Sequence, residues 1–223
     1  MLGASISKNS ILLGLFALVT AGVLAVTNVS TRDRIAESER QAAEQALYEL
    51  ITKDRVDNDL LNDTIATPAE MMPALGLTNP EAIYRARKNG QVIAVIVPAV
   101  APDGYSGAIR VLVGVNRDGS VAGARALAHK ETPGLGDKVD TNKSAWILSF
   151  NGKSLGNPAA ERWGVKKDGG SFDQFTGATI TPRAVTGQIK RVLQQVQEAH
   201  SLLFETSQHT DVNTPDNVGK RDE

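Results

Sequence analysis

The feature that most constrains this chain is an uncharged apolar segment close to its start. Residues 11–26 read ILLGLFALVTAGVLAV, and only Thr20 among them is polar. Together with its uncharged neighbours, over residues 9–30, this segment is long enough to cross a bilayer as a helix. A cleaved signal peptide is the alternative, because Lys8 precedes the run and residues 23–25 (VLA) would serve as a cleavage site. The run is longer than a usual signal core, so we expect an uncleaved anchor.

The flanking charges do not fix the orientation of this anchor. Lys8 lies before the segment, whereas Arg32 and Arg34 follow it. The positive-inside rule therefore disfavours export of the following domain, but large domains can cross a membrane regardless of such charges. From charge alone, both orientations stay open.

Composition removes several classes of function. The chain contains no cysteine, which excludes disulfides, thiol catalysis, cysteine-bound metals and haem attached through cysteines. Its three histidines are scattered without metal-ligand spacing, so no metal site is expected. A formal net charge of −1 gives no electrostatic reason to expect a nucleic-acid partner. The sequence also shows no arrangement of serine, histidine and aspartate typical of a catalytic triad and no pair of catalytic carboxylates. No catalytic residue is therefore expected.

The rest of the sequence predicts an α+β domain whose strands form an antiparallel meander. Asn89-Gly90 lies between two strand-like segments and is a strong signal for a hairpin. Apolar residues then alternate from Ile109 to Val115, as a half-buried strand requires. Short turns join the predicted strands, which favours an antiparallel arrangement. These strands are Ala82–Arg87, Val92–Val97, Ile109–Val115 and Val121–Ala128.

Helices are predicted before and after these strands. The segment from Thr31 to Asp54 has apolar residues at roughly helical spacing, with Thr31 and Asp33 as candidate caps. A short helix is expected around Lys143–Phe150, and a long helix is expected after Thr181. The long helix carries an apolar stripe that belongs in the core. The stripe comprises Val185, Ile189, Val192, Leu193, Val196 and Leu203.

Three loops are candidates for a ligand site. Residues 101–107 read APDGYSG and contain a typical turn sequence. Residues 129–137 read HKETPGLGD, where glycines on either side of Leu135 permit close approach of a ligand to the backbone. Residues 171–182 read SFDQFTGATITP, in which Thr181-Pro182 fits an N-cap followed by a helix-starting proline. The free N–H groups at such a helix start can bind an anion. Taken alone, each of these loop sequences is equally typical of an ordinary connecting loop without a ligand.

Taken together, the three loops resemble those of a known family. TGATIT, residues 176–181, resembles the flavinylation motif of FMN-binding domains, in which a flavin transferase joins FMN through its phosphate to a hydroxyl. The residue that follows Gly-Ala is Thr179, and Asp173 matches the acidic residue upstream of the motif. With APDGYSGAI and HKETPGLGDK in order, nearly the whole chain resembles the G subunit of the Rnf (Rsx) electron-transport complex.

The resemblance implies a single-pass protein of the bacterial inner membrane with its flavin domain on the periplasmic side. Its partners would be the other subunits of the complex and the flavin transferase that attaches FMN. Such complexes couple electron flow between NADH and ferredoxin to ion transport. This chain would be a redox carrier within that translocase, with little catalysis of its own, because a flavin carries the chemistry itself.

The resemblance also implies which residues hold the cofactor. Thr179 would carry the FMN phosphoester, with Thr181 as the helix cap. Lys166 is included because a cation near the flavin would stabilise its reduced anion, although a solvated charged turn is the favoured explanation of Lys166-Lys167. Trp146 and Trp163 are expected to pack in the core instead. The other expected cofactor-binding residues are Thr176, Gly177, Ala178, Asp173, Glu131, Thr132, Gly134, Leu135 and Tyr105.

The expected organisation of the chain follows. Residues 1–30 form a cytoplasmic N-terminus and transmembrane anchor, and residues 31–80 form a helical and turn-rich connecting segment. Residues 81–206 form the FMN-binding domain, and residues 207–223 are a polar tail expected to be disordered.

Two alternatives remain at this point. The C subunit of the sodium-translocating NADH:quinone reductase shares the Gly-Ala-Thr motif and the Glu-Thr-Pro-Gly-Leu-Gly loop. A non-redox binding or assembly domain with a vestigial flavin motif is the other. Protein made with a flavin transferase would be yellow in the first case and colourless in the second.

Overall fold

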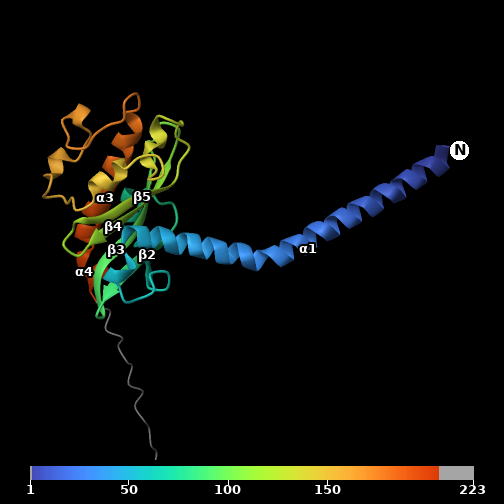
Figure 1. Cartoon of the computed structure of the whole chain (residues 1–223), viewed down its shortest axis with the longest axis horizontal. Helices are drawn as coiled ribbons and strands as arrows, with labels where there is room; N and C mark the ends of the chain where they lie inside the picture. Colours follow the sequence, from blue (N-terminus) through green and yellow to red (C-terminus); the bar gives the residue numbers. More distant parts are fainter. Residues whose placement is uncertain (1, 206–223) are drawn as a thin grey trace, which may run out of the picture. The chain divides into compact units, whose positions relative to one another are not determined.

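The computed structural model describes residues 2–205 of the chain (Figure 1). Its contacts divide the chain into two units, Met1–Glu49 and Leu50–Glu223. The tail predicted to be disordered, residues 207–223, lies outside the described residues.

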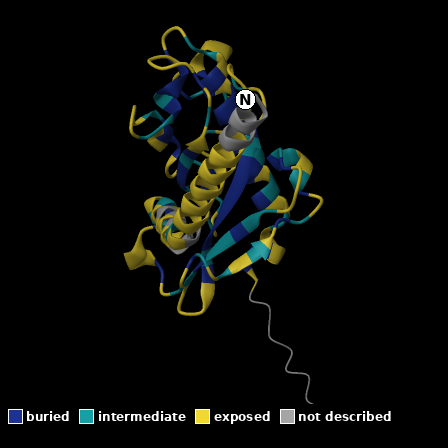
Figure 2. Ribbon diagram, turned by 90° about the vertical axis from the view of Figure 1, so that its right-hand side faces the viewer, coloured by how far each residue is buried: buried dark blue, intermediate teal, exposed yellow. Residues whose placement is uncertain are grey.

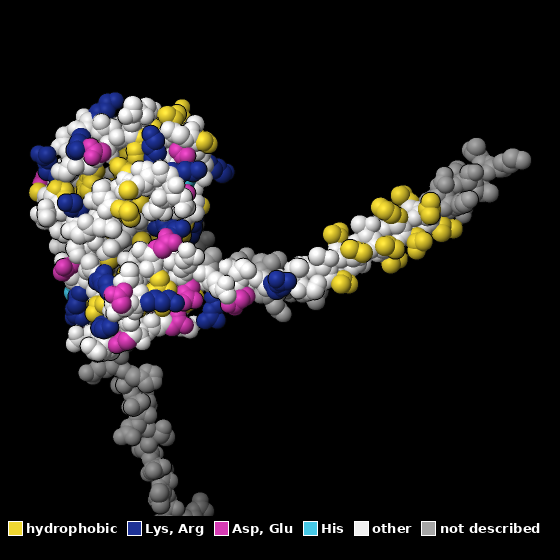
Figure 3. Space-filling view, in the orientation of Figure 1, with side chains coloured by type: hydrophobic (Ala, Val, Ile, Leu, Met, Phe, Trp, Pro, Cys, Tyr) yellow, Lys and Arg dark blue, Asp and Glu magenta, His cyan; other side chains and the backbone are white. Residues whose placement is uncertain are grey.

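The N-terminal unit is formed by one continuous helix. α1 runs from Leu2 to Leu50, and within it Ser10–Asn28 is long and apolar enough to span a bilayer. The large apolar side chains between Ile11 and Val26 are all more than half exposed, as Figure 3 shows by their yellow band on this helix. In water such a surface would be costly, and a bilayer would cover it.

The prediction of a separate helix beginning at Thr31 is wrong. α1 passes through this position without a break, and the Thr31 hydroxyl donates to the carbonyl of Thr27, 2.8 Å away, inside the helix. Inside a helix, a threonine or serine hydroxyl can bond to the carbonyl of the preceding turn, so Thr31 alone does not mark a helix start. α1 also ends at Leu50, before the predicted end at Asp54, and a short 3-10 turn, η1 (Lys53–Arg55), follows.

The second unit is built on a five-stranded antiparallel sheet in which neighbours in sequence are neighbours in space. The four predicted strands are confirmed, and a short first strand was missed. The strands are β1 (Thr64–Ala66), β2 (Ala82–Lys88), β3 (Gln91–Ala101), β4 (Ile109–Asn116) and β5 (Val121–Ala128). Residues 64–75, within the expected connecting segment, therefore supply β1 and the short helix α2 (Met72–Leu75) to this unit.

The turn between β2 and β3 has the geometry that its sequence predicts. Asn89 and Gly90 have φ angles of 51° and 76°, so both lie in the left-handed region. Two such residues in a two-residue loop are typical of a type I′ turn, whose twist matches that of the flanking strands.

The central strands are more buried than an alternating pattern requires. Val111 and Val113 of β4 face the main core, but Leu112 between them is also buried, at 6% exposure. A Cβ added to Gly123 of β5 would meet Leu50 at 3.1 Å, so the first residue of the second unit packs against the sheet. Figure 2 shows the resulting dark-blue strands. The expectation of a half-buried β4 is therefore corrected: from Val111 to Val115 both of its faces are covered, and Arg110 near its start is exposed.

Two helices complete the core. α3 (Ile180–Glu198) packs against β3 and β4, and α4 (His200–Phe204) follows it directly (Figure 1). The apolar stripe is buried as predicted, with Leu203 contributed by α4. Each of these aliphatic side chains stabilises the fold by roughly 1.5–3 kcal/mol when fully buried.

The chain between β5 and α3 contains only short 3-10 turns among its described helices. These are η2 (Gly136–Val139), η3 (Trp146–Phe150), η4 (Ala160–Arg162) and η5 (Lys166–Asp168). The helix predicted around Lys143–Phe150 is thus the 3-10 turn η3. An aromatic cluster holds this region, because Phe150 stacks on Phe172 at 4.4 Å between ring centroids and on Trp163 at 6.0 Å. Trp163 is buried and Trp146 packs against Phe175, so the prediction that both tryptophans are packing residues is confirmed.

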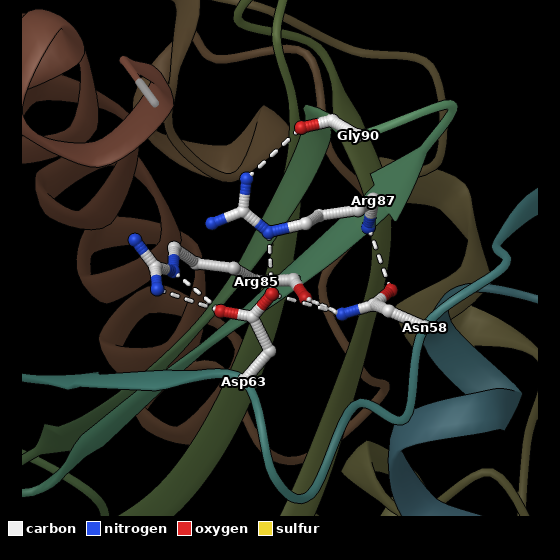
Figure 4. Close-up of polar contacts among 5 residues, drawn as sticks. All are labelled: Asn58, Asp63, Arg85, Arg87 and Gly90. Atoms are coloured by element: carbon white, nitrogen blue, oxygen red, sulfur yellow. Dashed lines mark hydrogen bonds and ion pairs between the residues drawn. The ribbon is translucent and has the colours of Figure 1, made fainter. Parts of the chain in front are cut away.

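An ion-pair network joins β1 to the rest of the sheet (Figure 4). Asp63 directly precedes β1 and accepts hydrogen bonds from Arg85 Nε at 2.8 Å and Arg87 Nε at 2.5 Å. Asn58 donates to the same carboxylate at 3.1 Å. Burial opposes ionisation of Asp63, but the Arg87 hydrogen bond and the two guanidinium charges outweigh it and lower the pKa of this carboxyl.

Candidate functional site

A cavity of about 330 Å³ lies at the N-terminal end of α3, where three distant segments of the chain meet. One segment is the loop between β3 and β4, another follows β5, and the last leads into α3. The volume lies in the range of small-molecule sites. The cavity is lined by Tyr105, Glu131, Thr132, Leu135, Gly136, Gly177, Ala178, Thr179, Ile180 and Thr181.

Thr179 is presented at the start of α3 with its hydroxyl free of a cap bond. α3 begins at Ile180, and Thr179 occupies the N-cap position without making a side-chain cap bond. Gly177, with a φ of 81°, turns the chain just before it, and the amide of Ala178 donates to the carbonyl of Phe175 at 3.1 Å. The first N–H groups of a helix have no partner within the helix. A partly exposed hydroxyl therefore lies beside a natural anion site.

The assignment of Thr181 as the helix cap is wrong. Thr181 lies inside the first turn of α3 and is fully buried, and Pro182 follows it as the third helical residue. The Thr181 hydroxyl donates instead to Oε2 of Glu131, fifty residues earlier in the chain. A cap hydroxyl would accept from a backbone N–H, whereas here the hydroxyl donates to a carboxyl group that the tertiary fold brings within reach.

Glu131 ties the three cavity segments together. Its side chain is only 5% exposed, yet both carboxylate oxygens are hydrogen-bonded. Oε1 accepts the backbone N–H of Ser106 at 3.0 Å, and Oε2 accepts the hydroxyl of Thr181. Its own backbone N–H donates to Nδ1 of His129 at 3.2 Å. Burying a carboxylate costs folding free energy unless hydrogen bonds compensate for the lost water. Glu131 can therefore stay buried only while the loops that carry its partners are held in place.

Gly136 is required by the same cluster. A Cβ at this position would lie 2.4 Å from Oε2 of Glu131 and 2.8 Å from Oγ1 of Thr181. The second glycine of the Gly-Leu-Gly sequence is therefore explained by the close approach of two buried polar side chains, a requirement that no local pattern reveals.

The mouth of the cavity is apolar. Tyr105, Leu135 and Ile180 line it and are 67%, 41% and 44% exposed. A Cβ on Gly177 would meet Cδ2 of Leu135 at 3.4 Å, so the Leu135 loop lies against the loop that carries Thr179. Three large apolar side chains around one opening suit a flat aromatic ligand. Ile180 was not among the expected binding residues, and its only sequence signal was its place beside Thr179.

Four of the expected binding residues do not line the cavity. Thr176 is exposed just before the turn at Gly177, and Gly134 is exposed between Thr132 and Leu135. Lys166 and Asp173 form an ion pair with each other at 2.6 Å, and both side chains are more than half exposed. Exposed pairs of this kind contribute little to stability.

The loop before the cavity is nevertheless held in place. The indole N–H of Trp146 donates to the carbonyl of Asp173 at 2.7 Å. Arg183 donates to both carboxylate oxygens of Asp168, at 2.6 and 2.8 Å, and so links η5 to the first turn of α3. This pairing lowers the pKa of Asp168 and raises the pKa of Arg183. Among the described residues, no cluster of His, Cys, Asp and Glu could hold a metal.

Comparison with known proteins identifies the family. Residues 104–194 match the FMN-binding domain, and residues 1–50 match the RnfG N-terminal region. The G subunit of an ion-translocating oxidoreductase complex from Pseudomonas aeruginosa is 52% identical over 189 residues, which cover 85% of this chain and 87% of that protein. The chain belongs to this G-subunit family.

Further members of the G-subunit family align over almost the whole chain. The protein from Vibrio atlanticus is 45% identical over 90% of this chain and 94% of its own length. The protein from Shewanella loihica is 43% identical over 96% of both chains. These matches confirm the resemblance drawn from the sequence and favour it over the quinone-reductase alternative. Every residue that lines the cavity lies within the FMN-binding domain match.

Proposed function

We propose that this chain is the electron-relay subunit of a membrane-bound ion-translocating oxidoreductase and carries FMN joined through its phosphate to Thr179. The proposal depends on one observation. Thr179 is the N-cap residue of α3, its hydroxyl makes no cap hydrogen bond, and it lies in the wall of a cavity whose opening is lined by apolar side chains. The family to which the chain belongs supports the redox role.

The residues of the cavity suit the two ends of FMN. A phosphodiester on Thr179 would retain one negative charge, and the N-terminus of α3 would stabilise it by roughly 0.3–1 kcal/mol if exposed. Tyr105, Leu135 and Ile180 would contact the isoalloxazine at the mouth. The flavin supplies the electron-transfer chemistry, and the protein binds and orients it.

The proposal includes a location and partners. We place the apolar part of α1 across the bacterial inner membrane, in a single pass, with the second unit on the periplasmic side. The other subunits of the complex would exchange electrons with the flavin during NADH and ferredoxin chemistry, and a flavin transferase would attach it. The apolar span and the family support this arrangement, whereas the flanking charges leave the orientation open.

The test is to replace Thr179 in protein produced together with a flavin transferase. Thr179→Ala should abolish covalent flavin, which is measured as lost fluorescence on a denaturing gel and lost FMN mass on the intact protein. Thr179→Ser should retain part of the flavin, since the oxygen survives. Thr176→Ala is the matched control and should remain flavinylated. A modified peptide that maps FMN to Thr176 or Thr181 contradicts the assignment.

The relay role is tested on the same flavinylated protein. Dithionite should bleach it, whereas NADH alone should be oxidised at a negligible rate, because a relay receives its electrons from other subunits of the complex. Rapid NADH turnover by the purified protein would show that it is more than a relay. Protein that stays colourless with the transferase present would favour a non-redox assembly domain.

A further inference from the structure

We infer that the buried carboxylate of Glu131 lowers the reduction potential of the flavin and so sets the driving force of the relay. This inference rests on the proposed function, since it needs a flavin in the cavity beside α3. It assigns Glu131 an electrostatic and positioning role, rather than that of one more contact to the ring.

The first support is the charge of the cavity wall. Among the described residues that line the cavity, Glu131 alone carries a formal charge. Both of its oxygens are hydrogen-bonded, Oε1 to the amide of Ser106 and Oε2 to the hydroxyl of Thr181, so both ends of the carboxylate are fixed at the cavity. The ion pairs found among the described side chains do not include it. The two hydrogen bonds stabilise the charge without cancelling it.

The second support is burial. Glu131 is 5% exposed, so little water lies between its carboxylate and a ligand in the cavity. Charges interact several times more strongly at the effective dielectric constant of a protein interior than in bulk water. Reduction adds negative charge to the isoalloxazine, and a fixed carboxylate nearby opposes that addition. The potential should therefore be more negative than in a neutral cavity.

The third support concerns the cation that the sequence suggested. Lys166 was expected to stabilise the reduced flavin, but it pairs with Asp173 at 2.6 Å and does not line the cavity. The described charges at the cavity therefore favour the oxidised flavin, whereas Lys166 was expected to favour the reduced flavin.

The hydrogen bonds of Glu131 allow charge and geometry to be separated. In Glu131→Gln, the remaining oxygen can still accept the amide of Ser106. The new NH₂ group can donate to the hydroxyl of Thr181, because a hydroxyl accepts as well as donates. The substitution thus removes the charge and keeps both ties between the loops. Glu161→Gln, at an exposed position on η4, is the control for loss of one charge outside the cavity.

The experiment is a redox titration of the full-length flavinylated protein in detergent. Covalent flavin is measured first, and its absence from the wild type would refute the proposed function rather than this inference. Glu131→Gln should shift the midpoint potential to more positive values by at least the roughly 30 mV that a tenfold change in a two-electron equilibrium represents. Glu161→Gln should leave the potential unchanged. An unchanged or more negative potential in flavinylated Glu131→Gln overturns the inference.

A second pair of variants applies if Glu131→Gln takes up no flavin. Thr132 lies exposed in the cavity wall, and Thr132→Lys would offset the charge of Glu131 while leaving its carboxylate in place. Its potential should be more positive than that of Thr132→Gln, which has a side chain of similar length and no charge. Equal potentials in these two variants overturn the inference.

Discussion

At Gly136 the cavity wall leaves no room for a side chain. Because a Cβ would lie 2.4 Å from Glu131 Oε2, Gly136→Ala should displace the carboxylate and Thr181 together. Overpacking of this kind costs about 1–3 kcal/mol. We expect a lower melting temperature and reduced covalent flavin, measured by thermal unfolding and gel fluorescence. Gly164→Ala is the control, since its Cβ would meet only Gly170 at an ordinary 3.9 Å. Equal behaviour of the two variants would contradict the geometry.

Thr181 should contribute to stability through Glu131 and not as a cap. Thr181→Val keeps the shape of the side chain but removes the donor to Oε2, leaving a buried carboxylate oxygen without that bond. An unsatisfied buried group costs about 1–3 kcal/mol, more when it is charged. Denaturant unfolding should show this loss, whereas Thr176→Val, at an exposed position, should stay within about 0.5 kcal/mol of the wild type. A neutral Thr181→Val would mean that the bond is dispensable.

The residue scale also shows where sequence reasoning reaches its limit. The local sequence placed Thr179 in the loop that leads into a helix, but the helix begins two residues earlier than predicted, so Thr179 itself occupies the N-cap position. The partner of Thr181 lies fifty residues away, so a local pattern of threonine followed by proline could not reveal it. The same holds for Gly136, whose need for a hydrogen side chain arises from the tertiary meeting of two polar groups.

Among the elements, β1 is held to β2 by a network that should respond to acid. The pKa of Asp63 is below its ordinary value of 3.8 in the folded state. Its contribution to stability is therefore fully present above the unfolded pKa and is lost as the pH falls through the lower, folded pKa. Asp63→Asn should destabilise the protein at pH 6, by roughly 1.5–3 kcal/mol for hydrogen bonds to a charged group.

The pH dependence of that difference is the measurement. Melting temperatures of the wild type and Asp63→Asn should differ by a constant amount at neutral pH and converge as the pH falls below 3.8 and through the lowered pKa of the folded state. Asp103→Asn, in an exposed turn, is the control and should match the wild type throughout. A gap that persists at low pH would mean that the contacts of Asp63 do not depend on its charge.

Elements with strong local signals were predictable, and those defined by pairing were not. The hairpin at Asn89-Gly90 and the apolar stripe of α3 follow from turn chemistry and helical periodicity. β1 has only three residues, and its pairing with β2, such as Ile65 opposite Ile83, is what makes it a strand. The double burial of β4 likewise depends on contacts from elsewhere in the chain.

For the molecule as a whole, the anchor decides how the protein behaves in a cell extract. If Ser10–Asn28 spans the membrane uncleaved, the full-length protein should stay with membranes through alkaline carbonate extraction. A chain that begins at Leu50, the start of the second unit, should be released as soluble protein. A mature N-terminus at Val26 would show instead that the segment is a signal peptide.

Because the cavity is formed by segments that are distant in sequence, it exists only after the second unit has folded, and this affects when flavin can be attached. β2 to β5 pair only with neighbours in sequence, and such local contacts form early in folding. α3 comes later in the chain, and its first turn, beside Thr179, is bonded to Glu131 across fifty residues through the hydroxyl of Thr181. If the proposed function is correct, a transferase that recognises the assembled cavity would not attach FMN to a chain that is incompletely folded. Covalent flavin would then be attached only to folded chains, which are the chains able to hold the cofactor.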